Sequence, residues 1–285
     1  MIFRILLVLL LATALAALLA VFIGNRRWHR DSGDLGSQVA NFRPVPSASR
    51  FDARELTGLP APVVRYFTHV LTPGQHLVTR ASFIQDGTFL MKLGADGWRS
   101  FQARQEFGVS PPAFIWDARI SMGPGMPVYV RDSYVAGRGA MRAELLALFP
   151  VAEAHGTREM AQGSLQRYLA EAMWLPTSLL PSQGVRWSAR DDSSAIATLT
   201  DGATTVSLEF HFNAAGDVRR VYTPARLREM DGRFVPMPWG AECSRHEEHE
   251  GMRIPSEAEV SWWVEGQRMP YWRGRITQAK YTFAP

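Results

Sequence analysis

Two histidines and two glutamates stand together at His246-Glu247-Glu248-His249, the densest group of metal-binding residue types in the chain. A histidine pair three residues apart serves one zinc ion when both residues lie on a helix. This stretch precedes Gly251 and is typical of a strand and turn, and strand residues three apart point to opposite faces. The lone Cys243 offers no disulfide. We therefore expect no metal site, and no cofactor is indicated.

Asp132 is the most unusual carboxylate in the sequence. It occupies one of the alternating positions between Val128 and Tyr134, so a strand would turn it into an otherwise apolar face. A buried carboxylate needs a partner or becomes protonated. Arg119 or Arg142 could be that partner, which predicts a buried structural ion pair. The alternative is that Asp132 is a functional acid.

A second group of functional residue types falls on a predicted helix. Tyr168, Glu171 and Trp174 are spaced by three, so they form one oblique stripe, and Arg167 can pair with Glu171 at a spacing of four. Two aromatic rings and a carboxylate could line the mouth of a pocket. The same stripe could equally pack against a sheet.

Common catalytic and nucleotide-binding motifs are missing from the sequence. No Gly-x-Ser-x-Gly, Walker or Gly-x-Gly-x-x-Gly motif stands between a strand and a helix. The net charge is +4, but the basic residues are scattered among 27 acidic ones. Without a basic stripe, the sequence predicts no nucleic-acid partner. No catalytic residue is assigned, and enzymatic activity stays open.

The N-terminal segment is apolar enough to enter a membrane. Residues 5–23 are apolar apart from Thr13, and as a helix they would span roughly 28 Å. Arg4 precedes the run, and three arginines and Trp28 follow within seven residues, as at a membrane interface. The alternative is a cleaved signal peptide, with a small-residue site at Ala14-Leu15-Ala16.

These features divide the chain into three parts. Residues 1–25 are the predicted transmembrane anchor or signal, the polar, breaker-rich residues 26–54 are a predicted linker, and residues 55–285 are one predicted domain. We expect a single-pass protein of the cell (inner) membrane. The side of the domain stays open, because the arginine count favours the cytoplasm while the N-terminus is typical of an export signal.

The remainder of the sequence predicts an α+β fold that is mainly antiparallel. Apolar and polar residues alternate repeatedly, most clearly over residues 206–212 and 257–264. Helices are expected near residues 60–71 and 158–173, the second capped by Thr157. We therefore expect a curved sheet or half-barrel with two or three packed helices. Hairpin turns are predicted at Asp86-Gly87, Asp96-Gly97, Asp201-Gly202 and Asp231-Gly232.

Several short sequences together resemble a family of bacterial and archaeal proteins classed as a domain of unknown function. They span roughly residues 55–283 and include Phe114-Ile115-Trp116-Asp117-Ala118, Arg131-Asp132-Ser133-Tyr134, Arg167-Tyr168-Leu169-Ala170-Glu171, Trp174-Leu175-Pro176 and Pro270-Tyr271-Trp272-Arg273-Gly274. The resemblance implies no activity. The order of elements is also similar to the half-barrel of lipoprotein carriers, which would imply a cavity for one apolar ligand.

The first functional hypothesis is a membrane-anchored protein that binds a lipid or another lipophilic molecule. Seven of the nine tryptophans fall in or beside the β-rich regions, where they could line a ligand cavity or form an aromatic core. The alternatives are a scaffold that binds a protein, whose identity the sequence does not give, and a membrane-proximal hydrolase that uses Asp132 or Glu171 with an arginine or tyrosine. The candidate ligand-binding residues are Trp116, Asp132, Tyr134, Tyr168, Glu171, Trp174, Trp262, Trp272 and Arg273.

Overall fold

Thirteen strands form one antiparallel sheet in the computed structural model, which describes residues 1–41, 49–230 and 232–285. Their spatial order is β6-β5-β4-β3-β2-β1-β13-β12-β11-β10-β9-β8-β7, so every neighbour except the β1–β13 pair is also consecutive in sequence. The strands are β1 (Val78–Phe89), β2 (Arg99–Gly108), β3 (Ala113–Ser121), β4 (Pro127–Val135), β5 (Arg138–Leu145), β6 (Phe149–His155), β7 (Arg186–Asp191), β8 (Ser194–Asp201), β9 (Thr204–Phe212), β10 (Val218–Met230), β11 (Arg233–His249), β12 (Met252–Val264) and β13 (Gln267–Phe283).

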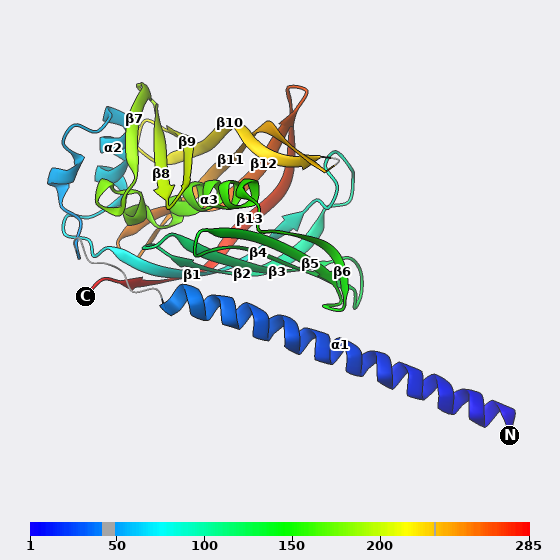
Figure 1. The fold of residues 1–285 in the computed structure, drawn as a ribbon. Helices are drawn as coiled ribbons and strands as arrows, with labels where there is room; N and C mark the ends of the chain where they lie inside the picture. The colour runs from blue at the N-terminus through cyan, green and yellow to red at the C-terminus, as the bar shows by residue number, and fades with distance from the viewer. Residues whose placement is uncertain (42–48, 231) are drawn as a thin grey trace.

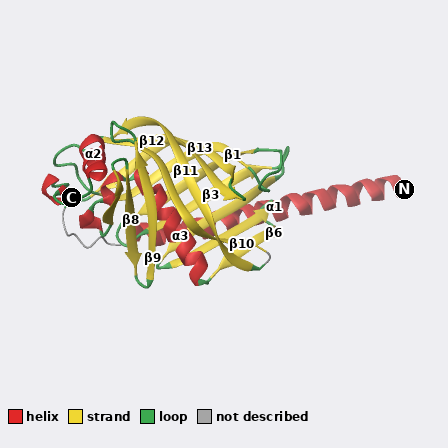
Figure 2. Cartoon of the chain, turned by 90° about the horizontal axis from the view of Figure 1, so that it is seen from above, coloured by secondary structure: helices red, strands yellow, loops and turns green. Residues whose placement is uncertain are grey.

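Helices cover both faces of this sheet. The sheet bends around α3 (Arg158–Glu171), which lies between β1–β6 on one side and β8–β12 on the other (Figures 1 and 2). On the concave side, α2 (Ala61–Val70) packs near β8 and β12. The long α1 (Ile2–Asn41) runs along the opposite, convex face. Four short 3₁₀ segments are η1 (Ala53–Leu56), η2 (Ala172–Trp174), η3 (Pro176–Leu179) and η4 (Pro181–Gln183).

The alternating sequence pattern forms the concave half of the core. In β9, Val206, Leu208 and Phe210 are buried while the residues between them are partly or fully exposed. The same faces of β2 and β3 meet the apolar side of α3, which begins after Thr157 as its capping side chain predicts. The predicted α+β fold with a curved, mainly antiparallel sheet is therefore confirmed.

The N-terminal helix is longer than the sequence indicated. It continues to Asn41, so residues 26–41, expected to be linker, are helical; residues 42–48 of that expected linker lie outside the described residues. Ser32 and Gly36, which were read as breakers, contact the sheet instead. A Cβ at Gly36 would lie 2.9 Å from a Glu106 carboxylate oxygen, so this glycine permits close packing. Tertiary contacts thus override a weak local helix propensity.

Trp28 fixes α1 to the convex face. Its side chain is 1% exposed, and its indole Nε1 donates to Asp117 Oδ1 at 3.0 Å. The guanidinium of Arg131 lies 4.1 Å from the Trp28 ring centroid and donates to the Trp28 carbonyl at 2.7 Å. Ser32, one turn further along α1, donates to the same Asp117 carboxylate. The second half of α1 is therefore an integral part of the folded body.

The predicted turns are only partly observed. Asp201-Gly202 joins β8 and β9 with Gly202 at φ +55°, as the hairpin prediction requires. Asp86-Gly87 is instead inside β1, and that prediction was wrong. Gly87 lets the backbones of β1 and β13 approach closely, because a Cβ there would lie 2.0 Å from the Arg273 carbonyl oxygen. Asp231 of the Asp231-Gly232 prediction lies outside the described residues.

Candidate functional site

A cavity of about 160 Å³ lies between the concave face of the sheet and α3. Side chains from seven strands and two helical segments converge on it, and most of them are aromatic or aliphatic. Asp132 borders it with 25% of its side-chain surface exposed, so the cavity is not sealed from solvent. The lining residues are Phe89, Trp116, Asp132, Arg167, Ala170, Glu171, Met173, Trp174, Arg226, Trp239, Ala241, Ala258, Val260, Tyr271 and Trp272.

Arg167 joins the two carboxylates of the cavity. It forms ion pairs with Asp132 and, at 2.8 Å, with Glu171 one helical turn away. Its guanidinium also lies 5.1 Å from the ring centroid of Phe114 and 5.0 Å from that of Trp116. Burial opposes the charge of Arg167, but Glu171 and Asp132 outweigh it and raise the pKa of this guanidinium. The sequence prediction of Arg119 or Arg142 as the partner of Asp132 is therefore wrong.

The Glu171 carboxylate continues into a chain of buried amides. It accepts a hydrogen bond from Gln105 Nε2 at 2.6 Å, and Gln105 Oε1 accepts from Gln85 Nε2 at 2.9 Å. The chain ends at Trp116, whose Nε1 donates to Gln85 Oε1 at 2.9 Å. Both glutamines are almost completely buried. Because each member is satisfied, this network fixes Glu171 and Trp116 rigidly at the cavity wall.

Arg226 is the second guanidinium of the cavity, and it is differently placed. Its Cζ atom lies 4.3 Å from the Trp239 ring centroid. Among the described residues no acceptor binds it, and its Nη1 is buried without a hydrogen-bond partner. Burial lowers the pKa of Arg226, although arginine remains protonated in proteins. The Nε1 of Trp174 is likewise an unpaired buried donor. The cavity therefore holds donors that a ligand acceptor would satisfy.

Tyr271 and Trp239 complete the aromatic wall beside Arg226. Trp239 Nε1 donates to the Tyr271 hydroxyl at 2.9 Å, and burial raises the pKa of Tyr271. Two planar rings held by this hydrogen bond offer a flat apolar surface next to a cation. Such a surface is suited to a molecule with an apolar body and an anionic or hydrogen-bond-accepting group.

Five of the nine sequence-predicted site residues line the cavity: Trp116, Asp132, Glu171, Trp174 and Trp272. The other four lie elsewhere. Tyr168 is in the packed core, and Tyr134 donates to Asp201 Oδ2 at 2.6 Å. Trp262 stacks on Tyr271 with ring centroids 6.5 Å apart, beside the cavity. Arg273 faces outward, where it pairs with Glu259 and lies 4.3 Å from the Trp98 ring centroid.

The sequence interpretation missed Arg226 as a site residue. Between Thr223 and Arg226 the pairing of β10 with β11 shifts register, so the regular alternation of inward and outward side chains is interrupted there. No local signal shows that the Arg226 side chain turns inward. Arg167 was noted as a partner of Glu171, but its second ion pair joins strand β4 to helix α3 across 35 residues of sequence.

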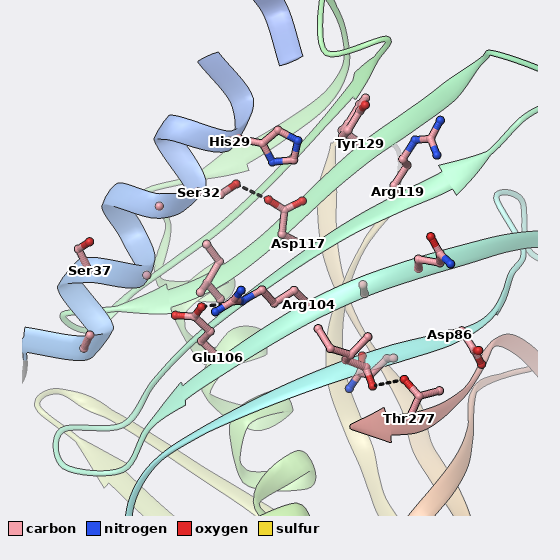
Figure 3. A pocket seen from close by; sticks show the side chains of 18 residues that line it. His29, Ser32, Ser37, Asp86, Arg104, Glu106, Asp117, Arg119, Tyr129 and Thr277 are labelled. Carbon is pink, nitrogen blue, oxygen red and sulfur yellow. Dashed lines mark hydrogen bonds and ion pairs between the residues drawn. The ribbon is translucent and has the colours of Figure 1, made fainter. Parts of the chain in front are cut away.

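A larger, open groove of about 820 Å³ lies on the convex face between α1 and the sheet (Figure 3). Two of its carboxylates already have partners: Asp117 accepts from Ser32 and Trp28, and Glu106 pairs with Arg104 at 2.9 Å. The groove is more open to solvent than the concave cavity, so it would enclose a ligand less completely. We therefore regard the concave cavity as the stronger candidate.

The comparisons with known proteins identify a family but no activity. Residues 57–281 match the model of a family of unknown function (DUF6920), and the chain belongs to this family. No curated protein matches it in sequence. Among solved structures, a LolA superfamily protein from Nitrosomonas europaea is 8% identical with a TM-score of 0.36, covering 80% of this chain and 95% of that one. A beta-barrel-like DUF1849 protein from Brucella abortus is 10% identical with a TM-score of 0.28, covering 72% and 99%.

Proposed function

We propose that this member of the DUF6920 family is a membrane-anchored binding protein for a lipophilic molecule that carries an anionic group. One observation carries the proposal: an aromatic-walled cavity contains Arg226, a guanidinium that stacks on Trp239 but has no hydrogen-bond acceptor among the described residues. A buried cation without an acceptor costs free energy in the empty protein. An anionic group on Arg226 would remove that cost, and the attached carbons would contact the Trp239 and Trp272 rings.

The size of the cavity limits what it encloses. Sites for drug-sized ligands measure roughly 300–1,000 Å³, whereas this cavity measures about 160 Å³. A cavity of roughly 150 Å³ takes a molecule such as benzene. The enclosed space therefore suits a carboxylate or phosphate group with a few carbons. The remainder of a longer ligand would extend through the opening beside Asp132.

Membrane attachment is assigned to the apolar half of α1. The helix is long and apolar enough to span a bilayer, and its most apolar window has no residue buried against the protein. Cleavage after Ala16 would leave Leu18, Phe22 and Ile23 exposed on a helix whose other end packs on the sheet. This supports an uncleaved anchor over a removed signal peptide.

The geometry supports the hydrolase alternative less well. Asp132 and Glu171 are both bound to Arg167, so neither carboxylate is free to accept a proton from a substrate. The described lining of the cavity contains no serine, threonine, cysteine, histidine or lysine. A structural role, in which Asp132 and Glu171 both hold Arg167 between β4 and α3, fits these contacts better than acid–base catalysis.

This function is tested by native mass spectrometry of the full chain, extracted from the membranes in which it is expressed. We expect an additional non-covalent mass, identified as an anionic amphiphile in a solvent extract of the same sample. Ala258→Leu, which fills part of the cavity, should lose that mass. Ala152→Leu is the matched control, because Ala152 is exposed on β6 away from the cavity. A wild-type chain that carries no mass and takes up no added oleate would contradict the proposal.

A further inference from the structure

One end of the sheet gathers the exposed apolar side chains of the domain. The turns of residues 90–98, 122–126, 146–148 and 265–266 lie at this end, because Phe89 pairs with both Arg99 and Trp272 and the neighbouring strands follow in register. We call these four turns, with the adjoining hairpin of β10 and β11, the turn end. Outside α1, the exposed large apolar side chains of the described residues are Ile84, Met91, Met126, Phe149, Val151, Met230 and Val235.

All of these residues except Ile84 lie at or next to the turn end. Phe149 is 59% exposed at the start of β6, and Met126 is 50% exposed in the turn before β4. Soluble surfaces carry single exposed apolar residues without consequence, but a group confined to one end marks an interaction surface. The opposite end of the sheet contributes none of the exposed large apolar residues among those described.

Helix α1 leaves the domain beside the turn end. Its Gly24 packs against the 146–148 turn, where an added Cβ would lie 2.5 Å from the Ala147 carbonyl oxygen. The apolar residues 2–23 begin immediately after this contact and project away from the sheet, beside β6 (Figure 1). Arg27 reinforces the junction through Glu144 at 2.5 Å and the Ala147 carbonyl at 3.0 Å.

We infer that the turn end rests on the bilayer surface and that Phe149, Val151 and Met126 enter its interfacial layer. This inference rests on the proposed anchoring by α1. Because α1 is one uninterrupted helix docked by Trp28, a bilayer that holds residues 2–23 must start close to the 146–148 turn. Apolar side chains at that level are stabilised by the headgroup and acyl boundary, as in interfacial amphipathic segments.

This placement brings the cavity close to the membrane. Phe89 is both the last residue of β1, directly before the 90–98 turn, and part of the cavity wall. Tyr271 lies on β13 beside it, with the two ring centroids 6.0 Å apart. A lipophilic ligand would then pass between the bilayer and the cavity at the turn end without crossing much water.

Site-specific fluorescence tests the inference with the full chain in phosphatidylcholine–phosphatidylglycerol vesicles. An environment-sensitive label on Met126→Cys or Phe149→Cys should shift to the blue and lose emission when brominated lipids are included. Arg138→Cys is the matched control, because Arg138 is exposed at the opposite end of β5. Cys243 is left in place, because its thiol is buried and burial raises the pKa of that thiol. The wild-type chain, treated with the same label, measures the background labelling of Cys243.

The outcomes separate the two proposals. If the chain floats with the vesicles but labels at positions 126 and 149 behave like the label at 138, the turn end does not contact the bilayer and the inference is overturned. If the chain does not float with the vesicles at all, the proposed anchoring itself fails. Quenching at 126 and 149 alone is the expected result.

Discussion

Replacing Arg167 by leucine should lower the free energy of unfolding by about 3–5 kcal/mol, one of the largest effects expected for a single substitution in this chain. Arg167 is the common partner of Asp132 and Glu171, and all three side chains are at least three-quarters buried. Removing it leaves two carboxylates close together in a low-dielectric cavity, where each loses its counter-charge. Urea unfolding followed by tryptophan fluorescence measures the change.

Two further variants isolate the cause of this loss. Arg104→Leu removes a guanidinium from a pair with Glu106 in which Arg104 is largely exposed, so stability should change by less than about 1 kcal/mol. Adding Asp132→Asn and Glu171→Gln to Arg167→Leu removes the unpaired charges and should recover part of the stability. An Arg167→Leu variant as stable as the wild type would show that the three side chains do not form a buried charge cluster.

Replacing Arg226 by methionine should affect binding and stability in opposite directions. The binding of oleate should weaken about 10- to 100-fold, since a hydrogen bond to a charged group contributes about 1.5–3 kcal/mol. The free energy of unfolding should stay the same or increase, because no hydrogen bond or ion pair of a described residue is lost, a desolvated charge is removed, and the methionine side chain can still pack on Trp239. Oleyl alcohol has the same chain without the charge, and its affinity should change little. Competition against a fluorescent fatty acid measures both ligands.

The matched control for this prediction is Arg220→Met. Arg220 lies on the same strand, and its guanidinium lies 4.4 Å from the ring centroid of Tyr222 and 3.6 Å from Glu242. The charge change is identical, but Arg220 does not line the cavity, so oleate affinity should stay at the wild-type level. Equal losses in both variants would assign the effect to net charge and would contradict a specific role for Arg226.

The sequence predicted the sheet better than it predicted the site. The alternation of apolar and polar residues over β2, β3, β9 and β12 is a local spacing pattern. It predicts the fold correctly because one face of each of these strands packs on the helices. The position of Asp132 on an apolar face was correct for the same reason. Its partner was wrong, because both suggested arginines turned out to lie on the far face and the actual one belongs to α3.

The missed features share one physical cause, which is dependence on tertiary contacts. The inward direction of Arg226 depends on a register shift between β10 and β11. The helical state of residues 26–41 depends on Trp28, Ser32 and Gly36 meeting the convex face, although serine and glycine favour a linker. Asp86-Gly87 has the composition of a turn, yet the close approach of β13 requires that glycine within a strand.

Photoaffinity labelling shows directly whether an amphiphile occupies the cavity. A diazirine-bearing fatty acid is added to the full chain in vesicles, irradiated, and the labelled peptides are mapped by mass spectrometry. We expect labels on the cavity-lining parts of α3, β10 and β13, displaced by oleate and reduced in Ala258→Leu but not in Ala152→Leu. Labels confined to α1 and the turn end, with none in the cavity, would mean that the protein contacts lipid only as a membrane and does not bind an amphiphile inside.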